Sequence, residues 1–102
     1  MAAFAMCGKM TAQAGQRDAL LDILSAAADL MRNVEGCQAY IVYKDADDED
    51  AIWVTELWDS KEAHDESLKA ENVRALIGQA MPLLAGSPEG ATLIPVTGKG
   101  FQ

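Results

Sequence analysis

The sequence is poor in the residues that build metal, redox and nucleic-acid sites. It holds one histidine and two cysteines, Cys7 and Cys37, whose spacing predicts neither a zinc site nor a dithiol redox motif. We expect both thiols to be small buried side chains in a reducing compartment. Only 8 residues are lysine or arginine against 16 aspartates and glutamates, and the net charge of −8 repels phosphate backbones. Nucleic acid is therefore not an expected partner.

Long hydrophobic runs are also missing. Half of the residues are hydrophobic, yet no uninterrupted apolar run approaches the roughly 20 residues needed to cross a bilayer. The first eight residues, MAAFAMCG, lack the basic start and the length of a secretory signal peptide. We expect a cytoplasmic protein without a membrane partner, and residues 1–102 are short enough to form a single domain.

The first half of the chain shows strand and helix patterns in alternation. Residues 3–10 are short and apolar, which predicts a buried strand. Apolar residues recur by threes and fours over 15–33, which predicts a helix, and Gly36 just beyond it suits a left-handed turn. Residues 37–44 and 51–58 are rich in β-branched and aromatic residues and predict an antiparallel pair. The acidic loop between them lacks the glycine and glutamate of a calcium-binding EF-hand, so we expect a solvated connection and no metal.

The second half continues with a broken helix and a last strand. Ser60 is a predicted N-cap, a helix begins at Lys61, and it breaks near residues 70–72 before an apolar stripe that ends at Pro82. Residues 91–97 predict the last strand, and Pro95 within it argues for an edge position because proline cannot donate to a sheet.

This order is β-α-β-β-α-β, which predicts a ferredoxin-like α+β fold with helices on one face of an antiparallel sheet. The strand over 51–58 is apolar in both phases of its alternation, so both of its faces should be buried. The helices cover one face only. We therefore expect a second copy of the chain to cover the other face in a two-fold homodimer.

The βαββαβ order, the segment VEGCQAY and above all ELWDSKEAHDESL resemble the antibiotic biosynthesis monooxygenase family of dimeric α/β barrels. The resemblance covers roughly residues 3–97, with Gly36, Glu56, Trp58, Ser60 and Ala63 as its strongest matches. It implies a cofactor-independent monooxygenase that deprotonates a small quinol, anthrone or polyphenol in an apolar pocket between helices and sheet. The electron-rich anion would react directly with molecular oxygen.

The sequence departs from this family at two positions. Many relatives carry a histidine where this chain has Ser67, and often another near Asn72. The haem-degrading members use a histidine on the later helix, where this chain has residues 75–77 and no iron ligand, so haem degradation is not expected. Two alternatives stay open, namely an isomerase of a small carbonyl compound on the same scaffold and a non-catalytic dimeric ligand-binding domain.

His64 is the candidate catalytic base, because an imidazole with its ordinary pKa near 6.5 suits proton transfer at neutral pH. Its position argues against that role. If Ala63, Ser67 and Ala70 face the sheet, His64 lies about 100° round the helix, at the shoulder of the buried face. A partly exposed helical histidine is therefore the favoured interpretation.

Six further residues are candidates for substrate binding: Ser67, Asn72, Trp53, Trp58, Tyr43 and Glu56. Ser67 and Asn72 can hydrogen-bond a phenolate or quinone oxygen, and their alternatives are a surface serine and a helix cap. Trp53 and Trp58 point to opposite faces of one strand, as Tyr40 and Tyr43 do, so one of each pair can line the pocket. Glu56 shares a face with apolar residues and needs a partner, across a dimer or in catalysis. The methionines read as core filler or as an adaptable pocket wall.

Overall fold

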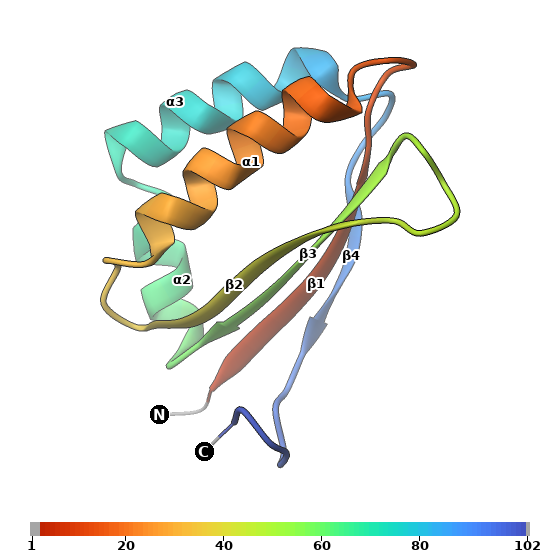
Figure 1. Cartoon of the computed structure of the whole chain (residues 1–102). Coiled ribbons are helices and arrows are strands. Elements are labelled where there is room, and N and C mark those ends of the chain that lie inside the picture. The colour runs from red at the N-terminus through yellow and green to blue at the C-terminus, as the bar shows by residue number, and fades with distance from the viewer. Residues whose placement is uncertain (1–2, 102) are drawn as a thin grey trace.

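The computed structural model describes residues 3–101 and has one antiparallel sheet with its helices on one face (Figure 1). The strand order is β2-β3-β1-β4, which confirms the predicted ferredoxin-like α+β arrangement. Helices α1 and α3 run side by side above the sheet, and α2 lies at the end of β3. The elements are β1 (Phe4–Thr11), α1 (Arg17–Met31), β2 (Cys37–Lys44), β3 (Ala51–Trp58), α2 (Lys61–Ser67), α3 (Glu71–Ala80), a 3-10 turn (Met81–Leu83) and β4 (Glu89–Leu93).

The last strand differs from the prediction. β4 spans Glu89–Leu93, so it begins before residue 91 and ends before Pro95. Its ladder with β1 runs only from the Ala5–Leu93 pair to the Lys9–Glu89 pair. Pro95 has no N–H to add to this ladder and lies beyond it. The predicted edge position of this strand is confirmed, because β4 is the last strand in the sheet order.

The core fills the space between α1, α3 and the sheet. Leu20 and Leu24 of α1 meet Ile52 and Val54 of β3 in one cluster of buried side chains. A second cluster joins Phe4, Met31, Trp58 and Val73. Apolar residues three and four apart on α1 therefore face alternate residues of β3, as the two periodicities require.

The turn after α1 depends on a glycine, as the sequence predicted. Gly36 has φ +91°, a conformation that L side chains rarely adopt. A Cβ at this position would also lie 2.8 Å from the Cβ of Ala63 on α2. Ser60, which is buried, precedes α2 and caps it. Its Oγ accepts a 3.1 Å hydrogen bond from the N–H of the same Ala63. Gly36 and Ser60 together fix where α2 lies.

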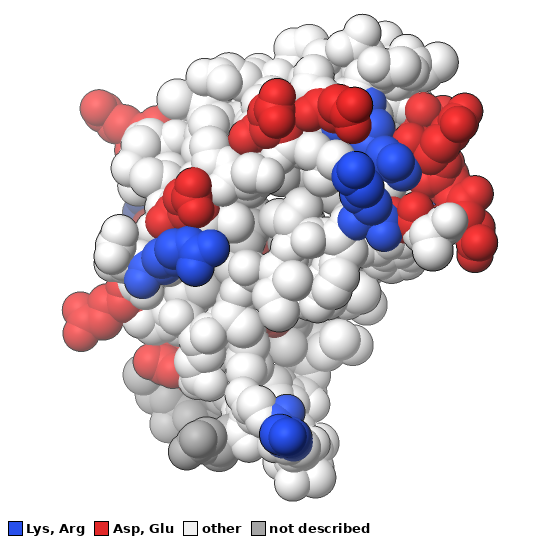
Figure 2. Space-filling model, in the orientation of Figure 1, with Lys and Arg blue, Asp and Glu red and all other residues white. Residues whose placement is uncertain are grey.

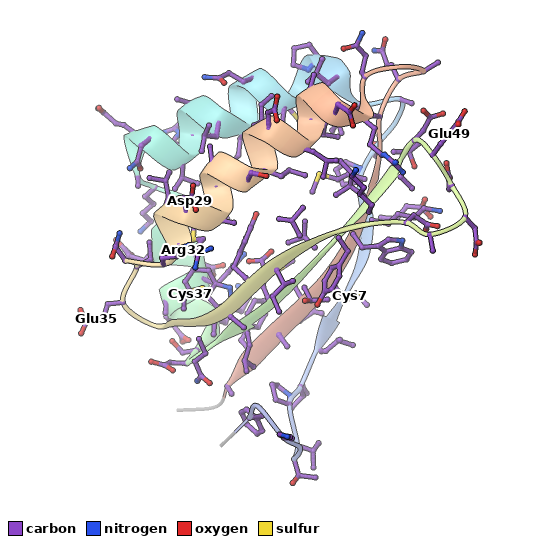
Figure 3. The ribbon with its side chains drawn as sticks, in the orientation of Figure 1. Cys7, Asp29, Arg32, Glu35, Cys37 and Glu49 are labelled. Atoms are coloured by element: carbon purple, nitrogen blue, oxygen red, sulfur yellow. The ribbon has the colours of Figure 1, made fainter. Side chains whose placement is uncertain are left out.

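The β2–β3 loop carries much of the acidic charge. Figure 2 shows acidic side chains gathered over this loop at the right of the view, and Figure 3 places Glu49 at its tip. The Asp45 carboxylate accepts hydrogen bonds from the N–H groups of Asp47 and Asp48 and, at 2.7 Å, from the Trp53 indole. The Trp53 bond, followed by the two backbone bonds, lowers the pKa of Asp45 to about 2. These bonds order the loop as a hairpin connection.

The two cysteines lie on different strands, with β3 between them (Figure 3). Both are half-buried, so the expectation of full burial holds only in part. Burial, with Glu56 nearby, raises the pKa of the Cys37 thiol. None of the helices in residues 3–101 combines the length and the apolar composition needed to cross a membrane.

The sheet face opposite the helices carries apolar side chains that the chain itself leaves open. Ile41 and Tyr43 of β2 are 47% and 41% exposed, and Leu93 of β4 is 47% exposed. Between them the outward side chains of Trp53 and Leu57 on β3 are half-buried. The expected burial of both faces of β3 is therefore incomplete within one chain, and the homodimer stays a prediction.

Candidate active site

A cavity of about 240 Å³ lies between the helices and the sheet. Its walls are mainly apolar, and α1 contributes Ile23, Leu24, Ala27 and Met31 to them. The polar side chains come from two places only, the neighbouring strands β2 and β3 and the short helix α2. They are Tyr40, Glu56, Trp58, His64 and Ser67.

Glu56 is held in the cavity by its strand register and by an indole. On the helix-facing side of the sheet, Glu56 pairs with Tyr40 of β2 and with Met6 of β1. The Trp58 Nε1–H donates a 3.0 Å hydrogen bond to Oε1 of Glu56. The partner that the sequence required for this carboxylate therefore comes from the same chain and the same strand.

His64 points into the cavity. Its side chain is 13% exposed, and its ring packs 5.1 Å from the Phe4 ring and 5.5 Å, edge-on, from the Trp58 ring, measured between centroids. The ring is thus more enclosed than a helical shoulder position implies. The difference arises because α2 lies at the end of β3 rather than along the sheet, so a side chain displaced round this helix still reaches the Phe4 and Trp58 rings.

Both ring nitrogens of His64 face carboxylates. Nε2 lies 4.0 Å from Oε1 of Glu56 inside the cavity, and Nδ1 lies 3.0 Å from Oδ1 of Asp65. Asp65 is itself held by Nζ of Lys61 at 2.7 Å. The Lys61 hydrogen bond, followed by that of His64, lowers the pKa of Asp65. A hydrogen on Nδ1 satisfies Asp65 and leaves the Nε2 lone pair directed at the cavity.

Ser67 and Asn72 are placed differently from each other. Ser67 lines the cavity and also an adjoining open groove, and its Oγ donates a 2.6 Å hydrogen bond to the His64 carbonyl. Asn72 lines only that groove and is exposed, with its Oδ1 accepting from the Val73 N–H. Ser67 therefore joins Glu56 and His64 in the cavity, and Asn72 does not.

Trp53 and Tyr43 lie on the opposite face of the sheet from the cavity. Trp53 bonds Asp45 there, and the Tyr43 hydroxyl lies 3.0 Å from Oγ1 of Thr55. Alternation along the strands separates these two side chains from Trp58 and Tyr40. The aromatic residues at the cavity are thus Trp58 and Tyr40, and the sequence alone left that choice open.

Tyr40 and an apolar rim are the cavity residues that sequence reasoning did not select. Burial, with Glu56 as the second cause, raises the pKa of the Tyr40 hydroxyl. Leu68, Ile77 and Met81 line the cavity and are 43%, 46% and 58% exposed, so they form its mouth. Met81 is therefore not core filler, and its place matches the alternative of an adaptable pocket wall.

The cavity has a clear charge preference. Among the residues that line it, none is lysine or arginine, and Glu56 is acidic. Within residues 3–101, no three histidine, cysteine, aspartate or glutamate side chains are grouped to hold a metal ion. The arrangement can bind a flat uncharged molecule and accept a proton from it at Glu56 or at Nε2 of His64.

Comparison with known proteins places the chain in a family. The antibiotic biosynthesis monooxygenase family model matches residues 3–79. A family member from Chloroflexus aurantiacus is 43% identical, with 94% of this chain and 95% of that chain covered and a TM-score of 0.85. Rv0793 from Mycobacterium tuberculosis has the same fold at 24% identity, with 95% and 98% of the two chains covered and a TM-score of 0.86. No curated protein matches. The chain belongs to the antibiotic biosynthesis monooxygenase family.

Proposed function

We propose that this cavity oxidises a small quinol, anthrone or polyphenol with molecular oxygen and without a cofactor. The observation that carries the proposal is the pairing of His64 with Glu56 across an apolar cavity. A cavity of about 150 Å³ can hold benzene, and the 240 Å³ found here has room for a larger ring system. Membership of a monooxygenase family supports the same reaction class.

The first step is transfer of a proton from the substrate hydroxyl. The 4.0 Å between Nε2 of His64 and Oε1 of Glu56 is too long for a direct hydrogen bond. A hydroxyl oxygen between the two atoms can lie about 2.8 Å from each. Nε2 accepts the proton, and Asp65 stabilises the resulting imidazolium through Nδ1–H, as the carboxylate of a catalytic triad does.

The second step is reaction of the substrate anion with oxygen. The anion gives one electron to O₂, and the resulting pair couples to form a C–O bond at a ring carbon. Protonation of the peroxide by His64 and loss of water leave a carbonyl at that carbon. The substrate therefore loses two hydrogens and gains one oxygen atom, and the second oxygen atom leaves in water. The apolar walls hold the ring and exclude bulk water from the peroxide.

The charge of the cavity restricts the substrate. Phosphorylated or carboxylated molecules would place an anion beside Glu56 with no basic side chain lining the cavity. Uncharged phenols avoid this repulsion. Repulsion by Glu56 also disfavours an isomerase of a phosphorylated carbonyl compound, so an isomerase of an uncharged carbonyl compound is the competing activity.

We also propose that two copies associate through their outer sheet faces. Ile41, Tyr43 and Leu93 are exposed there, and the half-buried Trp53 and Leu57 lie between them. Soluble monomers rarely expose a contiguous apolar surface of this kind. A two-fold pair would bury it, and the helix-side cavity of each copy would stay open.

Oxygen tracing tests the reaction. Metal-free protein is given 1,4-dihydroxynaphthalene under ¹⁸O₂, beside an anaerobic sample and a sample without protein. We expect a hydroxynaphthoquinone with one ¹⁸O atom, formed only with protein and oxygen. Oxygen-independent conversion would indicate the isomerase. A ligand-induced rise in Tm without conversion, across a panel of dihydroxynaphthalenes and anthrones, would indicate a binding domain.

A further inference from the structure

A second cavity of about 350 Å³ adjoins the first along the helix-facing side of the sheet. Met10, Tyr40, Glu56 and Pro88 line both cavities, so the two volumes meet at the carboxylate of the candidate active site. The second volume extends over β1 and β4. No helix lies over β4 (Figure 1), and all five residues of this strand are exposed.

The floor of this second cavity is made of backbone. Gly8 of β1 pairs with Val54 of β3 on one side and with Gly90 of β4 on the other. Val54 is buried in the helix-side core, so this row belongs to the helix-facing side of the sheet. The next row carries side chains on every strand, namely Tyr40, Glu56, Met6 and Thr92. Two adjacent glycines therefore leave a flat depression beside Glu56.

We propose that this depression, the Gly8–Gly90 lobe, is a second substrate subsite that holds a further aromatic ring. The proposal rests on the proposed function, because the first ring is placed with its hydroxyl at Glu56 and His64. Gly8 then determines how long a fused-ring substrate the enzyme accepts. This role adds a size limit to the reaction without changing its chemistry.

The chemistry of the lobe suits a flat, uncharged ring. A floor without side chains presents the faces of peptide groups, on which a planar ring can lie. Met6 and Met10 supply polarizable contacts at the ring edge. The Glu56 carboxylate lines the lobe, and none of its lining residues is basic, so a sulfonated or carboxylated ring is excluded.

Gly8 can be substituted without distorting the sheet. A Cβ added at Gly8 has one neighbour within 4 Å, the Glu89 carbonyl oxygen at 3.6 Å, which is an ordinary contact. A Cβ added at Gly90 would lie 2.8 Å from the Cys7 carbonyl oxygen, so that variant would disturb the strand pairing. Gly8→Ala therefore raises the floor of the lobe and keeps the fold. Gly78→Ala on α3, where a Cβ meets nothing within 4 Å, is the matched control.

The test is anaerobic binding of 2-naphthol and 2-hydroxyanthracene, which differ by one fused ring, measured by ligand fluorescence. Burial of one more ring removes roughly 60 Å² of apolar surface from water, so the wild-type protein should bind the three-ring ligand about tenfold more tightly. Gly8→Ala should lower the affinity for 2-hydroxyanthracene about tenfold and change the affinity for 2-naphthol less than about twofold. Gly78→Ala should change neither. Melting curves establish that both variants are folded.

Three results would overturn the subsite. The first is equal affinity of the wild-type protein for the two ligands. The second is an equal loss of affinity for both ligands in Gly8→Ala, and the third is no loss of affinity for either ligand in that variant. If dihydroxynaphthalene is oxidised and 2-naphthol binds as tightly as 2-hydroxyanthracene, the subsite is ruled out and the proposed function stands. If neither ligand binds the wild-type protein, both fail together.

Discussion

His64 and Glu56 face each other across the cavity, with Nε2 of the imidazole 4.0 Å from Oε1 of the carboxylate. The two side chains come from α2 and β3. Asp65 contacts the other ring nitrogen of His64, and the Trp58 indole donates to Oε1 of Glu56. In the gap between them a substrate hydroxyl can meet two proton acceptors. The proposed proton transfer takes place in this gap.

Glu56→Gln should reduce turnover while the cavity keeps its shape. The amide oxygen can still accept the Trp58 indole hydrogen bond, but the negative charge that helps His64 take the proton is lost. We expect kcat/KM for 1,4-dihydroxynaphthalene to fall about 100-fold, which is typical of an acid–base group. Glu62→Gln, in the exposed first turn of α2, is the control and should be unchanged. A kcat/KM within twofold of wild type in Glu56→Gln would remove the carboxylate from the mechanism.

Tyr40→Phe should reduce the amount by which the free energy of unfolding falls at alkaline pH. Burial raises the pKa of the folded Tyr40 above its unfolded value, which is near 10. The folded state then holds a proton that the unfolded state releases, so the contribution is complete below about pH 10 and is lost as pH rises further. Between about pH 10 and 11 we expect the free energy of unfolding to fall by about 1 kcal/mol less in the variant. Denaturant unfolding at both pH values measures this, and identical slopes would contradict it.

Gly36→Ala should destabilise the protein by about 2 kcal/mol, because alanine is strained at a left-handed φ. The added Cβ would also meet the Ala63 Cβ at 2.8 Å and push α2 away from the turn. Gly78→Ala, in the exposed interior of α3, should instead stabilise by about 0.5 to 1 kcal/mol. Urea unfolding compares the two, and an equal effect of both substitutions would show that neither the conformation nor the contact at Gly36 matters.

Ile41→Glu should separate the proposed dimer. Ile41 lies on the outer sheet face and is 47% exposed, so a carboxylate is tolerated in one chain but would be buried against its partner. We expect light scattering at micromolar concentration to give a dimer mass for the wild type and a monomer mass for the variant. Glu35→Gln, in the loop after α1, should stay dimeric. A wild-type monomer would contradict the proposed interface.

The sequence predicted the elements better than it predicted the site. β2 and β3 have the bounds expected from their β-branched and aromatic runs, and period-two alternation placed Glu56 and Trp58 on one face. That rule could not choose between Tyr40 and Tyr43. The register of β2 against β3 shifts between Cys37 and Ala39, so Cys37 and Tyr40 both reach the helix side. A bulge of this kind arises from the pairing of two strands, so it cannot be recognised from the sequence of β2 alone.

The orientation of His64 was also beyond local reasoning. Helix geometry gives the angle between neighbouring side chains but not the angle between a helix and the sheet. In α2 that angle is set by Ser60 and by the Gly36–Ala63 contact, which joins segments far apart in the chain. The Gly8–Gly90 lobe likewise needs the β1–β4 register before two separate glycines become one floor.

The most direct test is oxygen uptake by His64→Ala with 1,4-dihydroxynaphthalene, measured with and without added imidazole. His64 is the only histidine in the chain, and its removal leaves a space beside Glu56 that free imidazole can enter. We expect the protein-dependent rate to fall by a factor of about 100 or more and to recover in part with imidazole. An unchanged rate in the folded variant would rule out His64 as the catalytic base, because the proton would then leave the substrate without it.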